Sequence, residues 1–365
     1  MEQRKLQNQV QFFSGLTYSP NDVKDVGTFV IRSSNIKDNT LVSADNVYVN
    51  PNIANSEPVK KDDVIMVVRN GSKSLIGKHA LVTRKIDNTV IGAFMTGIRS
   101  STPYFLDALL DTLNFKKEIY KNLGATINQI TIGNLRKMTF KVPNESEKFK
   151  IGNLFKKLNY LLALYEMKKQ LLTQLKQGIV NFLITKNGQK PQLRFIGFNN
   201  NWESKSFEKL LNYEQPTKYI VKKADYISQG TPVLTANKSF ILGYTNETNV
   251  YQSIPAIIFD DFTLESKYVD FPFMVKSSAI KILTSKNSNL FFIYQLLNNQ
   301  KFVQEGHSRH YISVVQKKKV LVPSIQEQNK IGNLIKQLEN SIEQNSNTIT
   351  LLKRLKEFLL QNMFL

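Results

Sequence analysis

The chain has 365 residues, of which 41% are hydrophobic, and this length is enough for two ordinary globular domains. It contains no cysteine, which excludes disulfides, cysteine nucleophiles and thiolate metal sites, and no apolar run approaches the roughly 20 residues of a membrane span, so we expect a cytoplasmic protein. Lys and Arg number 49 against 29 Asp and Glu, a net charge of +20, which favours a polyanionic partner such as DNA over a merely lysine-rich composition.

The first predicted domain covers residues 1–143. Short β-rich runs dominate it, for example residues 64–68 and 139–142, and turn signals such as Arg69-Asn70-Gly71 bound these runs. A helix is expected over residues 103–114. The first domain is therefore predicted to be mixed α/β.

A long helix is predicted next, over residues 144–185, because apolar residues recur there every seven positions. Positions a and d of this heptad repeat form the seam of a coiled coil. Position a is taken by Ile151, Leu158, Tyr165, Leu172 and Ile179, and position d by Leu154, Leu161, Lys168, Leu175 and Phe182.

A linker over residues 186–197 leads to a second predicted domain, residues 198–323, with a β-rich run at 256–259 and a helix at 288–299. A second long helix follows over residues 324–365. Its position a is Ile331, Leu338, Asn345, Leu352 and Leu359, and its position d is Leu334, Ser341, Thr348, Leu355 and Asn362.

The two halves of the chain are related by an internal repeat. Val142-Pro143 and Val322-Pro323 lie 180 residues apart, and so do the segments Ile-Gly-Asn-Leu that begin at Ile151 and Ile331. A match over roughly 40 residues without gaps indicates two copies of one supersecondary unit. The predicted fold is thus α+β: two mixed α/β domains separated by two long helices that pair as an antiparallel coiled coil, with a pseudo-twofold repeat.

Antiparallel pairing places the polar seam residues Lys168, Asn345 and Thr348 together near the middle of the helices, where polar groups can fix the register. The alternative is that each long helix packs only on its own domain.

Motifs for catalysis or metal binding are not evident. The segment from Gly71 to Gly77-Lys78-His79 has one residue too many for a phosphate-binding loop, and His replaces Ser/Thr, so we interpret it as a hairpin. Asp261, Glu265 and Lys267 are too closely spaced for a nuclease triad. No carboxylate pattern accompanies His307 and His310, and we expect no catalytic residue and no metal ligand.

Polar and basic loops remain as candidate DNA contacts. Arg reads guanine and Asn or Gln reads adenine through paired hydrogen bonds, whereas Lys and Ser suit phosphates. Any single member is more often a solvated loop residue, but the set is informative. The candidates are Arg32, Ser33, Asn35, Arg69, Asn70, Ser72, Lys73, Arg99, Asn128 and Gln129 in the first domain, and Thr235, Asn237, Lys238, Arg309, His310 and Tyr311 in the second.

With repeated helices and two dissimilar domains, the chain resembles the specificity subunit of type I restriction–modification enzymes over essentially its whole length. Similar segments are Phe13-Ser14-Gly15-Leu16-Thr17-Tyr18, Val30-Ile31-Arg32-Ser33-Ser34-Asn35, Asp63-Val64-Ile65 with Arg69-Asn70-Gly71-Ser72, Ile258-Phe259-Asp260-Asp261, Val269-Asp270-Phe271-Pro272-Phe273, and Val322-Pro323 with Glu327-Gln328-Asn329-Lys330-Ile331. One departure is that Met1 stands before Glu2, where the family often has a Trp, as at Trp202 in the second domain.

The resemblance implies that each domain reads one half of a split double-stranded DNA target. The paired helices, roughly 50 Å long from about Phe149 to Leu183 at 1.5 Å per residue, would set the spacer and dock two modification subunits. Those subunits would use S-adenosylmethionine, and motor-nuclease subunits would use ATP and Mg²⁺; this chain itself would be non-catalytic and hold no cofactor. Alternatives are a basic coiled-coil scaffold, a stand-alone DNA-binding protein, an unrecognised nuclease or methyltransferase, and a single-strand or RNA binder.

Overall fold

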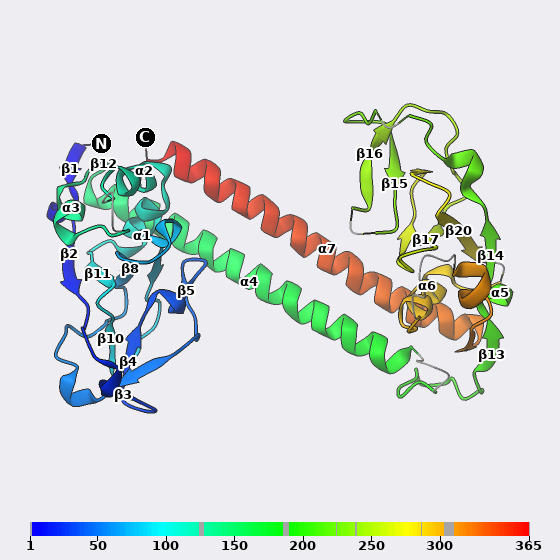
Figure 1. Cartoon of the computed structure of the whole chain (residues 1–365), viewed down its shortest axis with the longest axis horizontal. Helices are drawn as coiled ribbons and strands as arrows, with labels where there is room; N and C mark the ends of the chain where they lie inside the picture. Colours follow the sequence, from blue (N-terminus) through cyan, green and yellow to red (C-terminus); the bar gives the residue numbers. More distant parts are fainter. Residues whose placement is uncertain are drawn as a thin grey trace. The chain divides into compact units, whose positions relative to one another are not determined.

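The computed structural model describes residues 2–123, 128–184, 190–223, 225–237, 239–285, 287–302 and 310–364 (Figure 1). The chain forms two compact units. Unit 1 comprises Met1–Glu166 and Asn347–Leu365, and unit 2 comprises Met167–Ser346. The divisions fall inside both long helices, α4 (Glu145–Leu183) and α7 (Ile325–Asn362), so each unit contains one mixed α/β domain and a part of both helices.

The domain of unit 1 is built from small sheets and short helices. One sheet has the order β10-β4-β7-β3, a second β2-β11-β8-β9, and the pairs β5-β6 and β1-β12 stand beside them. The strands are β1 (Glu2–Lys5), β2 (Gln11–Ser14), β3 (Val23–Lys24), β4 (Thr28–Ile31), β5 (Ile36–Lys37), β6 (Thr40–Leu41), β7 (Val47–Val49), β8 (Val64–Val67), β9 (His79–Leu81), β10 (Thr89–Ile91), β11 (Met95–Arg99) and β12 (Thr139–Val142), and the helices α1 (Pro103–Asp111), α2 (Leu113–Lys121) and α3 (Ile132–Lys137).

The centre of this domain is strand β8, whose four residues are all buried. The strand lies between β11 and β9 in its sheet, α1 packs against β8 and β9, and the burial of all four residues shows that both faces of β8 are covered. A strand covered on both faces needs no polar alternation. The segment from Gly71 to His79 connects β8 to its antiparallel partner β9, which agrees with a hairpin rather than a phosphate-binding loop.

The domain of unit 2 has the sheets β14-β20-β17-β18 and β16-β15-β19 and the pair β13-β21. One core lies between the first sheet, α6 and the long helices, and a second lies between the two sheets. The strands are β13 (Glu203–Ser206), β14 (Leu211–Glu214), β15 (Thr231–Leu234), β16 (Ile241–Thr245), β17 (Ala256–Asp260), β18 (Ser266–Val269), β19 (Met274–Val275), β20 (Ile280–Ser285) and β21 (Lys319–Val322), and the helices α5 (Phe207–Leu210) and α6 (Leu290–Asn298).

The two domains repeat one plan, as the sequence predicts. In unit 1 the first strand pairs antiparallel with the last, Glu2 opposite Val142, and in unit 2 Glu203 stands opposite Val322. Each domain also has one parallel strand pair, β4 with β10 and β15 with β19. The internal repeat is therefore structural and is not confined to the long helices.

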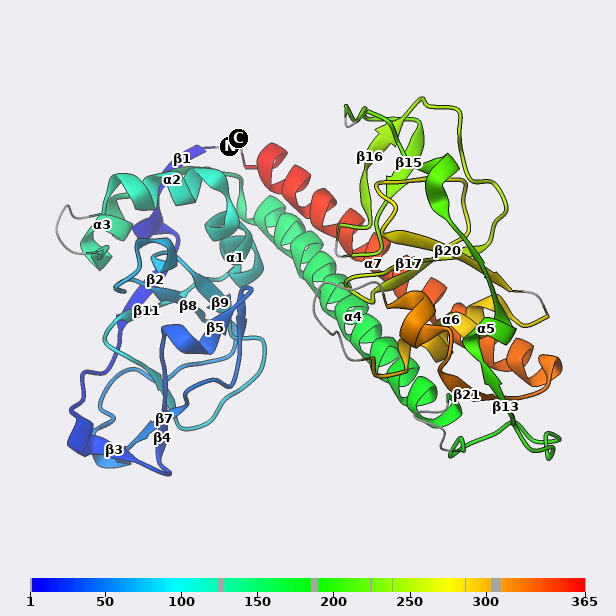
Figure 2. The ribbon, with the colours of Figure 1, turned by 45° about the vertical axis from the view of Figure 1, so that its right-hand side comes forward.

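Helices α4 and α7 run side by side in opposite directions within each unit (Figure 2). In unit 1, Glu166 Oε1 lies 2.9 Å from Lys353 Nζ, and the rings of Phe155 and Phe364 are 5.9 Å apart. In unit 2, Lys176 Nζ lies 2.5 Å from Glu339 Oε1. The predicted antiparallel pairing is confirmed.

The predicted seam is right in one of its two rows. On α4, position a is covered, with Ile151 and Leu158 buried and Tyr165 and Leu172 half-buried. On α7, position a is also covered: Ile331 and Asn345 are buried, and Leu338, Leu352 and Leu359 are half-buried, as are Leu334 and Thr348 of position d. The prediction is wrong for seven position-d residues, which are exposed: Leu154, Leu161, Lys168, Leu175, Phe182, Leu355 and Asn362.

The cause of this error lies at the helix ends. Phe155 and Leu183, both at heptad position e of α4, are buried in the cores of unit 1 and unit 2 respectively. They turn the helix so that positions a and e face inward, a spacing of four and three residues that a straight helix satisfies as well as a and d. Lys168 is therefore exposed, and the side chain of Asn345 donates to the carbonyl oxygen of Ser341 at 2.6 Å.

The same rotation leaves a row of large apolar side chains exposed on each helix, at positions d and g. We call this set the leucine row; its exposed fractions range from 39% to 67%. No described helix is long and apolar enough to cross a bilayer, so the row is a surface feature. Its members are Leu154, Leu161, Leu164, Leu171, Leu175 and Phe182 on α4, and Leu351, Leu355 and Phe358 on α7.

Candidate nucleic-acid interface

In unit 1, two loops that are far apart in the sequence meet beyond the end of β8. The Asn70 side chain donates from Nδ2 to the hydroxyl of Ser33 at 3.1 Å. Its Oδ1 accepts from the amide of Ser72 at 3.0 Å, a local bond typical of Asn in turns. The turn is therefore fixed, and it presents Ser72 and Lys73 to solvent.

A third segment completes this surface. Asn128 donates from Nδ2 to the carbonyl oxygen of Gly71 at 2.9 Å, and its own carbonyl accepts from Asn70 N at 3.2 Å. Gln129 pairs with Arg69 as an isolated antiparallel bridge. Seven predicted residues thus gather on one exposed or half-exposed surface, the first-domain patch: Ser33, Arg69, Asn70, Ser72, Lys73, Asn128 and Gln129.

Sequence reasoning missed two aromatic side chains in this region. Phe94 is 54% exposed, and the guanidinium carbon of Arg69 lies 5.0 Å from its ring centre. Tyr120 is 51% exposed, and Lys73 Nζ lies 5.9 Å from its ring centre. Phe94 stands among apolar residues in the sequence, so pattern alone assigns it to the core. Tyr120 lies in a mostly charged segment, which does not distinguish it from any other exposed tyrosine. Cations over aromatic faces gain stabilisation that depends on how far they are desolvated.

Three predicted contacts of the first domain are structural instead. Asn35 is buried; it accepts from Arg32 N at 2.9 Å and donates to the carbonyl of Ala44 at 2.7 Å. Arg32 donates to the carbonyl of Asp45. These bonds hold the turn over 32–45, as buried polar groups must be satisfied, and they leave the Asn35 side chain unavailable to a base.

Arg99 is the third. Its guanidinium bonds both carboxylate oxygens of the buried Asp63, at 2.8 and 3.1 Å, and Glu57 at 2.7 Å. The hydrogen bonds to Asp63 raise the pKa of Arg99 beyond its already high value. Arg99 therefore holds the start of β8 and is not a free guanine reader.

In unit 2 the predicted His310 and Tyr311 are buried. The amide of Tyr311 donates to Asp261 Oδ1 at 2.7 Å, and His310 Nδ1 lies 3.3 Å from the carbonyl oxygen of Asp261. Tyr311 packs against Phe259 and Tyr213 in the core. As direct base contacts these two predictions are wrong, because both side chains are buried.

The other predicted contacts of unit 2 differ in their exposure to solvent. Thr235 is buried and donates to Asn237 Oδ1 at 2.5 Å, so it supports Asn237, which is exposed. Lys238 and Arg309 lie outside the described residues. Thr235 is thus a supporting residue, and Asn237 is the accessible one among the predicted contacts of this domain that the structure describes.

Asp261 itself forms a buried ion pair with Lys281. The Nζ–Oδ2 distance is 3.4 Å, both side chains are 2% exposed, and Lys281 Nζ also donates to Gln215 Oε1 at 3.0 Å and to the carbonyl of Ser278 at 3.1 Å. This pair explains the acidic segment that superficially resembles a nuclease motif. Among the described residues, no three His, Cys, Asp or Glu side chains are arranged to hold a metal.

An accessible group near Asn237 was not predicted. The amide of Lys276 bonds the carbonyl of Leu234 at 3.1 Å, which places Lys276 beside the loop that carries Asn237. Its Nζ lies 3.2 Å from Tyr226 Oη and 5.5 Å from that ring centre. Lys276 could not be singled out from the sequence, because lysine is frequent along the whole chain. We call Tyr226, Asn237 and Lys276 the second-domain patch.

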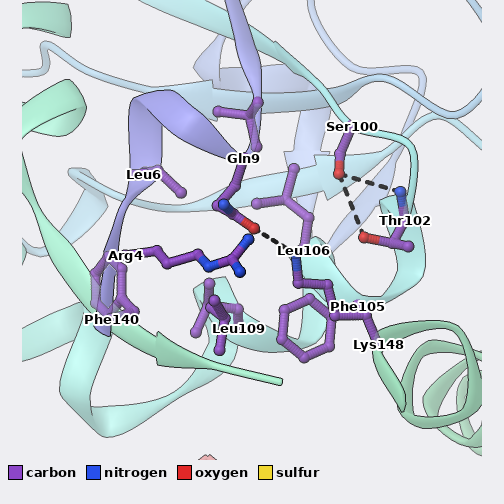
Figure 3. A pocket seen from close by; sticks show the side chains of 12 residues that line it. Arg4, Leu6, Gln9, Ser100, Thr102, Phe105, Leu106, Leu109, Phe140 and Lys148 are labelled. Atoms are coloured by element: carbon purple, nitrogen blue, oxygen red, sulfur yellow. Dashed lines mark hydrogen bonds between the residues drawn. The ribbon is translucent and has the colours of Figure 1, made fainter. Parts of the chain in front are cut away.

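A small cavity in unit 1 lies between β1, β12 and α1 (Figure 3). Its free volume is about 10 Å³, which holds roughly one water molecule. Gln9 and Lys148 form a hydrogen bond across it. It cannot receive a nucleotide or S-adenosylmethionine.

A buried charge cluster ties α7 to the first domain. His79 Nε2 lies 3.7 Å from both Asp107 Oδ1 and Asp111 Oδ1, and Lys356 Nζ lies 2.9 Å from Asp111 Oδ2. Burial raises the pKa of Asp107 to about 6, against the opposing effect of His79. Burial alone would raise the pKa of Asp111 as well, but His79, Lys356 and Asn39 together lower it.

The geometry defines a class: an internally repeated α+β protein whose two domains are joined to one antiparallel helix pair. Residues 199–354 match the family model of the type I restriction modification DNA specificity domain. The chain is 50% identical over 123 residues to the EcoR124I/EcoR124II specificity subunit of Escherichia coli, covering 31% of this chain and 30% of that protein. It is 26% identical over 177 residues to the StySPI specificity subunit of Salmonella potsdam, covering 46% and 37%.

Two solved structures share the fold. The crystal structure of the type I restriction-modification system S subunit from M. genitalium superposes with a TM-score of 0.73 at 14% identity, covering 100% of this chain and 96% of that one. A chain from a study of complex assembly in the type I R-M system gives 0.50 at 13%, covering 100% and 97%. The alignments to the curated relatives span only about a third of those proteins. The family model and the curated relatives thus match parts of this chain, and the solved S-subunit structure shares its fold over the whole chain.

Proposed function

We propose that this chain is the DNA-specificity subunit of a type I restriction–modification complex, that each α/β domain reads one half of a bipartite target, and that the chain performs no catalysis itself. The observation that carries the proposal is the convergence of three separate segments on the first-domain patch, around the bond from Asn70 to Ser33. Its Arg, Asn and Gln side chains suit base edges and its Lys and Ser side chains suit phosphates.

The second-domain patch also contains an amide and a lysine, Asn237 and Lys276, and adds the aromatic ring of Tyr226. Its side chains and their order differ from those of the first-domain patch, so the two half-sites should differ. The net charge of +20 supports a long contact with duplex DNA, whose affinity should fall steeply with salt. A protein-binding scaffold that is basic only by composition would show no such salt dependence.

The leucine row supports docking of the modification subunits. Contiguous exposed apolar surface on a soluble protein commonly marks an interaction site. Because the row occurs on both helices at equivalent heptad positions, such as Leu171 and Leu351, two copies of the same partner can bind. S-adenosylmethionine, ATP and Mg²⁺ would belong to the partner subunits.

The helix pair would also fix the spacer between the half-sites. Helix α4 has 39 residues, about 58 Å at 1.5 Å per residue. That length corresponds to roughly one and a half turns of DNA at about 34–36 Å per turn.

The decisive experiment is a genome-wide map of methylated adenine with and without this gene, in a host whose modification subunit is active. We expect the loss of a single motif made of two short, different halves around a fixed gap. If no motif changes while the modification subunit remains active, the specificity role is refuted and the scaffold alternative gains.

Docking can be tested separately by substituting the leucine row. L171E and L351E place a charge in the proposed interface and should abolish co-purification of the modification subunit. T173E adds the same charge at an exposed position of α4 outside the row and should leave co-purification intact. Equal loss with T173E would show a general effect of charge and not a docking surface.

A further inference from the structure

Phe94 and Arg69 form an exposed pair on a rigid support. Phe94 lies in a tight turn closed by the bond from Met95 N to the carbonyl of Gly92, 2.9 Å. The carbonyl of Phe94 accepts from the amides of Val68 at 2.9 Å and Arg69 at 3.2 Å. Both residues are thus anchored through the backbone at the end of β8, and only their side chains extend into solvent.

The fold itself does not require a phenylalanine at this turn. Phe94 belongs to none of the hydrophobic clusters of unit 1, and more than half of its surface is exposed. Turn positions ordinarily carry Gly, Asn, Asp or Ser. The guanidinium carbon of Arg69 lies 5.0 Å from the ring centre. The ring therefore contacts the Arg69 side chain and does not pack in the core.

Stacking on the ring orients Arg69. A guanidinium over an aromatic face has its plane restricted, and its N–H donors remain directed outward. Among the described residues, no carboxylate forms a salt bridge with Arg69, in contrast to Arg99, which Asp63 and Glu57 occupy. Arg69 is therefore preorganised and unoccupied, the condition under which a paired hydrogen bond to a base is strongest.

We propose that Arg69 and Phe94 read two adjacent base pairs in the major groove of the first half-site, Arg69 taking a guanine and Phe94 a thymine. This inference rests on the proposed DNA-specificity role. The guanidinium donates two hydrogen bonds to guanine O6 and N7, and the exposed ring edge packs on the thymine 5-methyl group. Around the pair, Ser72 and Lys73 face the phosphates.

The pair can be tested through the methylation motif itself. The full chain is expressed with its modification subunit, and methylated adenines are mapped for each variant. R69A and R69K should relax the guanine position by roughly five- to a hundredfold, since Lys keeps the charge but loses the fork. F94A should relax the neighbouring thymine position by about three- to tenfold, whereas F94L, which keeps an apolar contact, should retain most of the preference.

A matched control exists in the same domain. Arg84 is exposed and follows β9, whose Leu81 stands opposite Val64 at the start of β8, the end away from Arg69. R84A removes one positive charge and should lower methylation uniformly at most. In every variant the second half-site must stay unchanged, which shows that the complex has assembled and folded.

The thymine contact has its own measurement. With the purified complex, a duplex carrying uracil in place of that thymine loses only the methyl group. Wild-type methylation should fall several-fold on uracil, and the F94A variant should not distinguish the two duplexes. Equal rates of the wild-type complex on both duplexes would overturn the role of Phe94.

The outcomes separate this inference from the proposed function. If deleting the gene changes no motif, the specificity role itself fails. If the gene defines a motif but R69A and F94A lower methylation without altering any base preference, the pair contacts only the DNA backbone or widens a groove, and the inference is overturned.

Discussion

The two α/β domains share one arrangement of strands, but the polar residues of their loops lie in different environments. In the first domain, the predicted polar residues of three loops bond to one another through Asn70 and Asn128 and leave an exposed patch. In the second, His310 and Tyr311 turn inward to Asp261. A polar loop residue therefore lies at the surface only where no buried carboxylate or unpaired backbone group draws it inward through a hydrogen bond.

The largest expected effect tests this buried network. D261A leaves the ammonium of Lys281, whose side chain is 2% exposed, without its counterion, and removing one partner of a buried pair costs about 3–5 kcal/mol. The single tryptophan, Trp202, packs edge-on against Phe292 in unit 2, so its fluorescence during urea unfolding reports this domain. The control D270A breaks an exposed pair with Lys336 and should change stability by less than about 1 kcal/mol. If D261A and D270A lowered the free energy of unfolding by equal amounts, the buried ion pair of Asp261 would not stabilise the second domain.

The corresponding buried cluster of the first domain should respond to pH. Because the pKa of Asp107 is raised to about 6, its contribution to stability is full below about pH 4 and is lost as pH rises through 6. D107N cannot ionise, so relative to wild type it should gain about 2 kcal/mol between pH 4 and pH 8. Urea unfolding followed by circular dichroism at several pH values measures this gain. D25N, at an exposed carboxylate, is the control; a gain as large in D25N would contradict the assignment.

Much of the fold could be predicted from the sequence. The internal repeat at a spacing of 180 residues and the heptad pattern predicted two equivalent helices. An antiparallel pair of these helices buries the apolar stripe of each. Which second row faces inward could not be predicted, because a/d and a/e spacings are both compatible with the leucines. Phe155 and Leu183 decide it through contacts with their domain cores, and such long-range contacts leave no periodic signal.

The site was predictable where local chemistry fixes the structure. Asn70 closes a turn through its own side chain, a tendency that the residue carries by itself. Phe94 was missed because exposure of an aromatic residue depends on what the fold places beside it. Likewise the burial of His310 depends on Asp261, which lies 49 residues away in the sequence.

A pair of equivalent glycines tests how closely each long helix approaches its own domain. A Cβ at Gly152 would lie 2.8 Å from the amide nitrogen of Phe105, and a Cβ at Gly332 would lie 2.8 Å from Oδ1 of Asn289, the N-cap of α6. G152A and G332A should each destabilise their unit by about 1–3 kcal/mol. G178A, also in α4 but with nothing within 4 Å, should instead stabilise by about 1 kcal/mol. The denaturant concentration at the unfolding midpoint is measured for all three variants. If G152A raised this midpoint, α4 would not be packed closely against α1.

The smallest effect concerns equivalent acids at the starts of the long helices. In unit 2, Glu327 is buried and accepts from Arg194 Nε at 2.9 Å and Nη2 at 2.7 Å, and hydrogen bonds to Glu327 raise the pKa of Arg194. Its counterpart in unit 1, Glu147, is exposed. E327Q keeps one acceptor but loses the charge, so it should lower the tryptophan-detected stability of unit 2 by about 1 kcal/mol. E147Q should stay within about 0.5 kcal/mol of wild type. If the two variants behaved alike, the bond from Arg194 would contribute nothing to the second domain, and the two helix starts would be equivalent in energy despite their different surroundings.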